Sequence, residues 1–148
     1  MIVVTGAAGF VGQAVHERLN EAGHDVLALT HGKLFQPGHG EISLDLNDPR
    51  HYESLRNSCE AAGTLIHLAG LVPVALGPGI DGDHRPRATA QDFSGVYQSN
   101  VVMTARLLEF ALSVGIRHFV FASSQSGYGM QPATVVTEDT PPAPLEHY

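Results

Sequence analysis

The chain has 148 residues, of which 43% are hydrophobic and 16% are charged, and its formal net charge is −7 at pH 7. This length and composition suit one globular domain with a genuine core rather than a disordered chain. The acidic balance disfavours nucleic acid and anionic membrane surfaces as partners, so we expect neither.

The chain opens with a strand pattern, Met1-Ile-Val-Val4, which runs into the turn Thr5-Gly-Ala-Ala-Gly-Phe-Val-Gly12 and then into a helix pattern. A strand that leads through a glycine-rich turn to a helix N-terminus forms a cradle for phosphate. Gly6 permits the tight turn, Gly9 lets a pyrophosphate approach the backbone, and Gly12 allows the helix to pack closely on the sheet. This stretch predicts a site for a dinucleotide, and a plain structural glycine turn is the alternative.

Further strands alternate with helices along the rest of the chain. Predicted strands cover 25–30, 41–45, 64–69 and 117–123, and predicted helices cover 9–22, a stretch that begins at Asp48-Pro49, and 89–114. This alternation implies right-handed crossovers and an α/β fold, a doubly wound parallel sheet in the order 3-2-1-4-5. A ligand is then expected over the carboxyl ends of the strands. We expect one domain over 1–148, with 124–148 as an irregular tail.

Apolar spacing predicts the buried faces of the two longer helices. In the first helix this face comprises Phe10, Val11, Ala14, Val15, Leu19 and Ala22. In the long helix it comprises Val101, Ala105, Leu108, Ala111 and Leu112. Gly23 and Gly115 are expected to end these helices as C-terminal caps.

The single cysteine, Cys59, excludes a disulfide framework and a cysteine-based metal site, and we expect it to be a packed core residue. His67 is also expected in the core, and the other histidines lack the spacing of metal ligands, so no metal is predicted. No apolar run approaches the ~20 residues of a membrane helix. The first strand leaves no room for a signal peptide, so a cytoplasmic location is expected.

Five motifs follow one another in a characteristic order. They are the turn Thr5–Gly12, Asp45-Leu46, His67-Leu-Ala-Gly70, Asn100 within Tyr97-Gln-Ser-Asn-Val101, and Ser123-Ser-Gln-Ser-Gly-Tyr-Gly129. In these motifs the chain resembles the extended short-chain dehydrogenase/reductases, a family of NAD(P)-dependent nucleotide-sugar epimerases and dehydratases. The resemblance covers essentially all 148 residues and implies a Rossmann-type NAD(P)-binding domain, truncated and without a separate substrate domain. The segment that ends at Tyr148 resembles the one leading into the family's Tyr-x-x-x-Lys.

The resemblance implies roles for individual residues around a bound dinucleotide. Those expected near the pyrophosphate are Gly6, Gly9, Phe10, Val11 and Gly12. Those expected near the adenosine are Thr30, His31, Lys33, Asp45 and Leu46. Leu68, Ala69 and Gly70 are expected along the path of the ribose and nicotinamide, Asn100 is expected to help organise the active site, and Ser123 is also expected at the cofactor. The implied catalytic residues are Ser124 and Tyr148.

Several of these residues also fit ordinary structural roles. Asp45 fits a simple strand end, and Asn100 fits a solvated helix position. Ser123 and Ser124 fit strand-end hydroxyls that satisfy backbone groups.

The chemistry implied by the resemblance is hydride transfer between a substrate carbon and the nicotinamide, with a tyrosine as the base. A tyrosine has an ordinary pKa near 10, so the family's lysine is needed to lower it. Ser124 would hydrogen-bond the reacting oxygen. No lysine follows Tyr148 here, so we expect an N-terminal piece of a longer protein that binds cofactor weakly and turns over no substrate alone.

The second predicted strand bears on the choice of cofactor. An NAD-specific site places a carboxylate at the end of this strand for the ribose hydroxyl, whereas this chain has Thr30 and His31 there, with Lys33 nearby. A missing carboxylate removes repulsion against a 2′-phosphate, and Lys33 would attract one. The expected cofactor is therefore NAD or NADP, with a lean to NADP.

The sequence leaves more than one function open. The first is an epimerase, dehydratase or reductase that acts on a small-molecule substrate, a nucleotide sugar or related compound, with a possible homodimer in the intact protein. The alternative is a non-catalytic NAD(P)-binding sensor or regulatory module on the same scaffold. A fragment that binds nothing is the third possibility.

Overall fold

A parallel five-stranded sheet forms the centre of the molecule. The computed structural model describes residues 1–32, 40–71, 90–129 and 135–144. The strands are β1 (Ile2–Thr5), β2 (Val26–Thr30), β3 (Glu41–Ser43), β4 (Thr64–His67) and β5 (His118–Phe121). Their order is β3-β2-β1-β4-β5, which confirms the predicted doubly wound topology.

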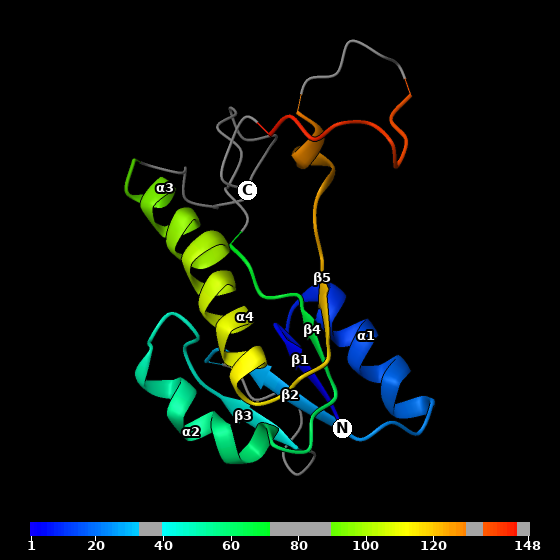
Figure 1. Cartoon of the computed structure of the whole chain (residues 1–148), viewed down its shortest axis with the longest axis vertical. Coiled ribbons are helices and arrows are strands. Elements are labelled where there is room, and N and C mark those ends of the chain that lie inside the picture. The colour runs from blue at the N-terminus through cyan, green and yellow to red at the C-terminus, as the bar shows by residue number, and fades with distance from the viewer. Residues whose placement is uncertain (33–39, 72–89, 130–134, 145–148) are drawn as a thin grey trace, which may run out of the picture.

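Helices cover both faces of this sheet (Figure 1). They are α1 (Phe10–Glu21), α2 (Arg50–Cys59), α3 (Ala90–Tyr97) and α4 (Met103–Ser113), with a π-helical turn η1 (Gln98–Val102) and a 3₁₀ turn η2 (Gln125–Tyr128). α1 lies on one face, and α2 and α4 lie on the other. No helix in the described part of the chain is long and apolar enough to cross a membrane.

Two apolar layers hold the helices to the sheet. On the α2 and α4 face the core includes Val3, Leu29, Leu55, Cys59, Leu65, Met103, Leu107 and Phe110. On the α1 face a smaller core consists of Val4, Ala7, Val26 and Ala28, with Ile2, Leu19, Ile66 and Leu68 packed against it. The strand residues alternate between the two layers, as expected for a sheet that is buried on both faces.

The helix ends follow from local sequence. Gly23 and Gly115 have φ values of 77° and 80°, and each follows a helix whose last carbonyls it helps to satisfy. Ile116 N donates to Ala111 O and Gly115 N donates to Leu112 O, which is the double hydrogen bond of a glycine-terminated helix. Before α2, Asp48 Oδ1 accepts a hydrogen bond from the backbone N of Arg50, the first residue of the helix, whose N-cap position is Pro49.

The predicted buried face of α1 is largely wrong. Phe10 is 96% exposed and Val11 is 57% exposed, whereas the buried residues of this helix are Gly12 and His16. Gly12 faces inward because the helix starts directly against the glycine turn. Phe10 and Val11, which directly follow the turn, therefore point to solvent, whereas Val15 is half-buried and Leu19 packs against the smaller core.

The predicted inner face of the long helix is also wrong, with one exception. Ala111 is buried, but Val101, Leu108 and Leu112 are exposed, and Ala105 is exposed as well. The residues that contact the sheet are Met103, Leu107, Phe110 and Ala111. This helix carries apolar residues on two faces, and their spacing alone does not indicate which face meets the sheet.

Candidate functional site

The glycine turn after β1 packs against the loop after β4. Gly6 has a φ of 68°, and a Cβ on it would lie 2.7 Å from Ala69 N, so both the backbone conformation and the close approach require glycine. A Cβ on Gly12 would overlap the Gly6 carbonyl oxygen. Gly12 thus lets the helix start close against the turn. The expected close packing involves the glycine turn as the neighbour of Gly12, rather than a strand of the sheet.

The N-terminus of α1 is left open at its mouth. Its N-cap residue is Gly9, no side chain caps it, and no acidic residue occupies the first turn. Gly9 N donates to Gly6 O at 2.9 Å, so the Gly9 amide is already used within the turn. The amides at the N-terminus of α1 that face a ligand therefore belong to the first helical residues. Such uncapped amides, together with the helix dipole, favour an anion at this position.

Thr5 joins the glycine turn to the loop after β4. Its Oγ1 accepts hydrogen bonds from Leu68 N and Ala69 N, both at 3.2 Å, and lies 2.7 Å from His67 Nδ1. The two amides occupy the lone pairs of the hydroxyl, so its proton is donated to His67 Nδ1. His67 then carries its own proton on Nε2 and donates it to Thr104 Oγ1 at 2.9 Å.

His67 is therefore a neutral histidine with a fixed tautomer. It is 1% exposed, and its burial lowers the pKa to about 4 because the charged form is poorly solvated there. The expected core position of His67 is confirmed, and its function in the fold is to fix residues 68–70 against β1 and α4. Cys59 is also a packed core residue, as expected, with no exposed surface and a thiol pKa raised to about 11 by burial.

The loop Asp45–Asn47 is held by α2 and α4. Asp45 Oδ1 accepts from Asn47 N and Asn47 Nδ2. The backbone carbonyls are bound from outside the loop: His51 Nδ1 lies 2.8 Å from Asp45 O, Tyr52 OH donates to Leu46 O, and Arg106 donates to Asn47 O. Each loop residue thus has an external or internal anchor, which makes the loop a rigid wall.

Asn100 fixes the last described residue of the loop after β4. Its Oδ1 accepts from Leu71 N at 2.8 Å, and its Nδ2 donates to Leu71 O at 2.9 Å. Asn100 lies in the π-helical turn η1, which divides the predicted long helix into α3 and α4. Single π turns commonly occur at functional sites. The alternative of a solvated helix residue therefore does not describe Asn100, whose amide is paired with the loop backbone.

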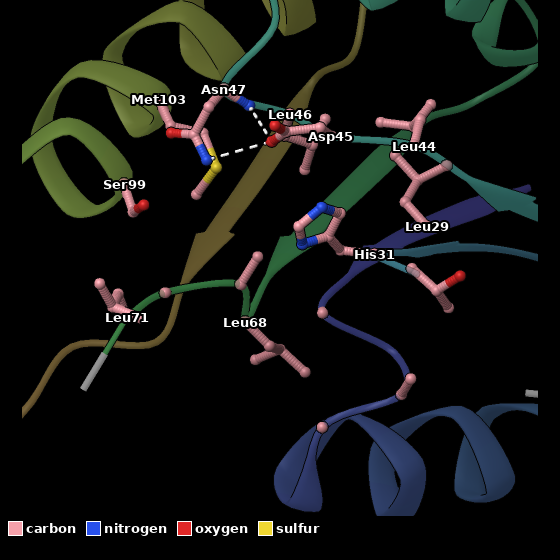
Figure 2. A pocket seen from close by; sticks show the side chains of 16 residues that line it. Leu29, His31, Leu44, Asp45, Leu46, Asn47, Leu68, Leu71, Ser99 and Met103 are labelled. Carbon is pink, nitrogen blue, oxygen red and sulfur yellow. Dashed lines mark hydrogen bonds between the residues drawn. The ribbon is translucent and has the colours of Figure 1, made fainter. Parts of the chain in front are cut away.

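These loops enclose a first cavity of about 370 Å³ over the carboxyl ends of β1, β2 and β4. Figure 2 shows the imidazole of His31 pointing into it, opposite Asp45 and Asn47. The sequence-predicted residues that line it are Gly6, Gly9, Thr30, His31, Asp45, Leu46, Leu68, Ala69 and Gly70. Among the described residues, Asn47 Oδ1 is the buried side-chain polar atom that has no hydrogen-bond partner, and Asn47 lines this cavity.

A second cavity of about 390 Å³ lies between the β4 loop and the end of β5. The sequence-predicted residues that line it are Val11, Leu68, Ala69, Gly70, Asn100, Ser123 and Ser124. Ser124 Oγ accepts from Ser126 N at 3.2 Å and so caps η2. Residues 68–70 line both cavities, which makes the two cavities neighbours along one edge of the sheet.

Some predicted residues lie elsewhere. Phe10 lines neither cavity and is exposed, and Gly12 is buried against the turn. Lys33 and Tyr148 lie outside the described residues. Sequence reasoning did not single out the anchoring residues Thr5, His51, Tyr52, Thr104 and Arg106. Thr5 lies within the glycine motif, but none of these side chains has a sequence pattern that marks it as an anchor.

The arrangement fits an elongated anionic ligand with a planar group at one end. The open helix mouth and the side-chain-free turn suit a pyrophosphate. The unpaired acceptor of Asn47 at the far wall suits an amino donor such as that of adenine. Two adjoining cavities provide room for two nucleosides rather than one.

Comparison with known proteins agrees with this geometry. The model of the NAD dependent epimerase/dehydratase family matches residues 2–148. A 3-beta-hydroxysteroid dehydrogenase of Mycolicibacterium neoaurum is 25% identical over 84% of this chain and 32% of that protein. The chain spans about a third to a half of the length of the curated relatives it matches.

Solved structures show the same similarity. A short-chain dehydrogenase/reductase superfamily protein from Agrobacterium tumefaciens with bound NAD is 31% identical, with a TM-score of 0.78, over 100% of this chain and 40% of that chain. MoeE5 in complex with UDP-glucose and NAD is 34% identical, with a TM-score of 0.75, over 99% of this chain and 44% of that chain.

Proposed function

The chain belongs to the NAD dependent epimerase/dehydratase family, and from this premise we propose that it holds NAD or NADP across its two cavities. The observation that carries this proposal is the shared wall of the cavities at residues 68–70. A dinucleotide has two nucleosides joined by a pyrophosphate, and the glycine turn lies at the same edge of the sheet. One ligand would therefore fill both cavities and neutralise the open helix mouth between them.

Each part of the site has a proposed task. The amides at the start of α1, with Gly6 and Gly9 beside them, bind the pyrophosphate. Asp45 and Leu46 contact the adenine, and residues 68–70 line the path to the nicotinamide. The rigid anchors of these loops place the contacts before the ligand arrives, so little ordering accompanies binding.

The second cavity is the proposed place of reaction. A bound nicotinamide supplies hydride chemistry, and Ser124 would donate a hydrogen bond to the reacting oxygen of a substrate. Tyr148 is the proposed base by resemblance. The chain spans only about a third to a half of the length of the curated relatives it matches, so we propose that the 148 residues by themselves bind the cofactor without measurable turnover.

The proposed substrate class is a nucleotide sugar or a related alcohol or carbonyl compound. MoeE5 is described with UDP-glucose, which favours this class. A relative described as a steroid dehydrogenase favours the broader class of secondary alcohols. Both classes require oxidation or reduction at a carbon that bears oxygen.

The test is a calorimetric titration of NAD into the chain and two glycine variants. Gly9→Ala adds a methyl group at the helix mouth, 3.1 Å from Gly6 O, and is expected to weaken NAD binding at least about tenfold. Gly63→Ala is the matched control, because its methyl group would lie 3.7 Å from an Arg117 side-chain nitrogen, an ordinary contact. Thermal unfolding of both variants identifies any loss of fold.

Two results contradict the proposal. One is the absence of binding of both NAD and NADP to the folded chain. The other is equal NAD affinity in the wild-type chain and the folded Gly9→Ala variant. A steady-state rate of substrate turnover by the 148-residue chain would contradict the separate proposal that it only binds.

A further inference from the structure

The end of β2 lacks a carboxylate of its own, but the structure brings one from the neighbouring strand. Thr30, the last residue of β2, donates its hydroxyl proton to Glu41 Oε1 at 3.0 Å. Glu41 is the first residue of β3 and pairs with Ala28, so its side chain reaches along the sheet to Thr30. Thr30 is 3% exposed and lines the first cavity.

The hydrogen bond determines what Thr30 offers to a ligand. A threonine hydroxyl has one proton, and a carboxylate accepts hydrogen bonds without donating them. The proton of Thr30 is therefore directed at Glu41, and the oxygen of Thr30 presents only lone pairs to the cavity. A group that approaches Thr30 must itself donate a hydrogen bond.

NAD and NADP differ in whether the group at the ribose 2′ position can donate a hydrogen bond. The adenosine ribose of NAD carries a 2′-hydroxyl, which can donate. In NADP this hydroxyl is replaced by a phosphate, whose oxygens accept and whose negative charge is repelled by the nearby carboxylate of Glu41. In dinucleotide-binding folds this ribose lies at the end of the second strand.

Other groups also lie at the end of β2. His31 follows Thr30, and its imidazole points into the first cavity (Figure 2). Ser43 Oγ accepts a hydrogen bond from Gly32 N at 3.2 Å, which fixes the turn after β2 and uses that amide. A histidine ring also accepts or donates to a ribose hydroxyl, so His31 does not by itself favour a phosphate.

We propose that Glu41, acting through the Thr30 hydroxyl, is a specificity-determining residue that favours NAD over NADP. This inference rests on the proposed dinucleotide site. It opposes the lean to NADP, which relied on the lack of a carboxylate at the end of β2 and on attraction by Lys33, a residue outside the described part of the chain. The carboxylate is present, but it comes from a strand eleven positions later in the sequence.

The test compares NAD and NADP affinities at one ionic strength for four proteins. They are the wild-type chain, Glu41→Gln, Thr30→Val and the control Glu21→Gln, which removes an exposed carboxylate at the opposite end of α1. We expect the wild-type chain to bind NAD at least about tenfold more tightly than NADP. Glu41→Gln should bring the two affinities within about threefold by strengthening NADP binding, and Glu21→Gln should leave their ratio unchanged.

The ratio of the NAD affinity to the NADP affinity distinguishes a residue that determines specificity from one that only maintains the structure. Thr30→Val removes the acceptor and should weaken NAD binding about tenfold, with little change for NADP. The inference is overturned if wild-type protein binds NADP as tightly as NAD, or if Glu41→Gln weakens both cofactors equally. If neither cofactor binds to the folded wild-type chain, the proposed function itself fails.

Discussion

His67 illustrates how much one side chain contributes to the site. Its two ring nitrogens contact Thr5 on β1 and Thr104 on α4, and Thr5 in turn holds the amides of residues 68 and 69. A protonated imidazole would donate from both nitrogens and would turn the Thr5 hydroxyl proton away from it. The site therefore depends on a neutral histidine.

This dependence predicts how stability changes with pH. The folded-state pKa of His67 is lowered from 6.5 to about 4, so the unfolded chain binds the proton first as the pH falls. The contribution is fully present above pH 6.5 and is lost as the pH falls to about 4, at a cost of up to about 3 kcal/mol in the free energy of unfolding.

Urea unfolding between pH 7 and pH 4 measures this loss. His67→Gln should be less stable at pH 7 but should show a shallower pH dependence than wild type. His118→Gln, a change at an exposed histidine on β5, should keep the wild-type slope. Equal slopes in wild type and His67→Gln would contradict the neutral-histidine interpretation.

The helices show where sequence periodicity fails. The helical stretch α3–η1–α4 has one apolar face on the sheet and a second, exposed apolar stripe, which we define as Tyr97, Val101, Leu108 and Leu112. These side chains are 45%, 39%, 44% and 72% exposed. Their spacing places them on one side of the α3–α4 helix, and exposed apolar stripes of this kind commonly mark an interface.

We propose that the homodimer expected of the intact protein uses this apolar stripe. Leu108→Glu should weaken self-association by about 2 kcal/mol or more, because a charge would be buried between the two copies. Val135→Glu, at a residue that is 70% exposed and outside the stripe, is the control. Sedimentation velocity over a concentration series measures the effect, and an unchanged association constant in Leu108→Glu would rule out this stripe as the interface.

The strands and caps could be predicted because each has a local cause. Short apolar runs predict every strand to within about two residues at its ends. Gly23 and Gly115 predict the helix ends because glycine readily adopts the positive φ that each of these caps has. The π turn at Asn100 could not be predicted, because it depends on a loop 29 positions earlier that its side chain binds. The contact of Thr30 with Glu41 likewise depends on strand register, which no motif records.

At the scale of the whole molecule, the site is an assembly of segments that are distant in sequence. The turn after β1, the end of β2, the loop after β3, the loop after β4 and the π turn all meet over one edge of the sheet. The order of the strands was predictable from the alternation of elements, and this order alone brings the loops together. The residues that make the loops rigid were not predictable, since the anchors are spread over β1, α2, η1 and α4 and no sequence pattern marks them.

The most direct test of the dinucleotide site is a titration of NAD followed by backbone amide NMR of the ¹⁵N-labelled chain. We expect the largest shifts in the turn after β1 and the first residues of α1, in residues 45–47 and in residues 68–71, and little change at Gly63 and Gly115 on the opposite edge. Shifts that cluster away from these loops, or none at saturating NAD, would contradict the account.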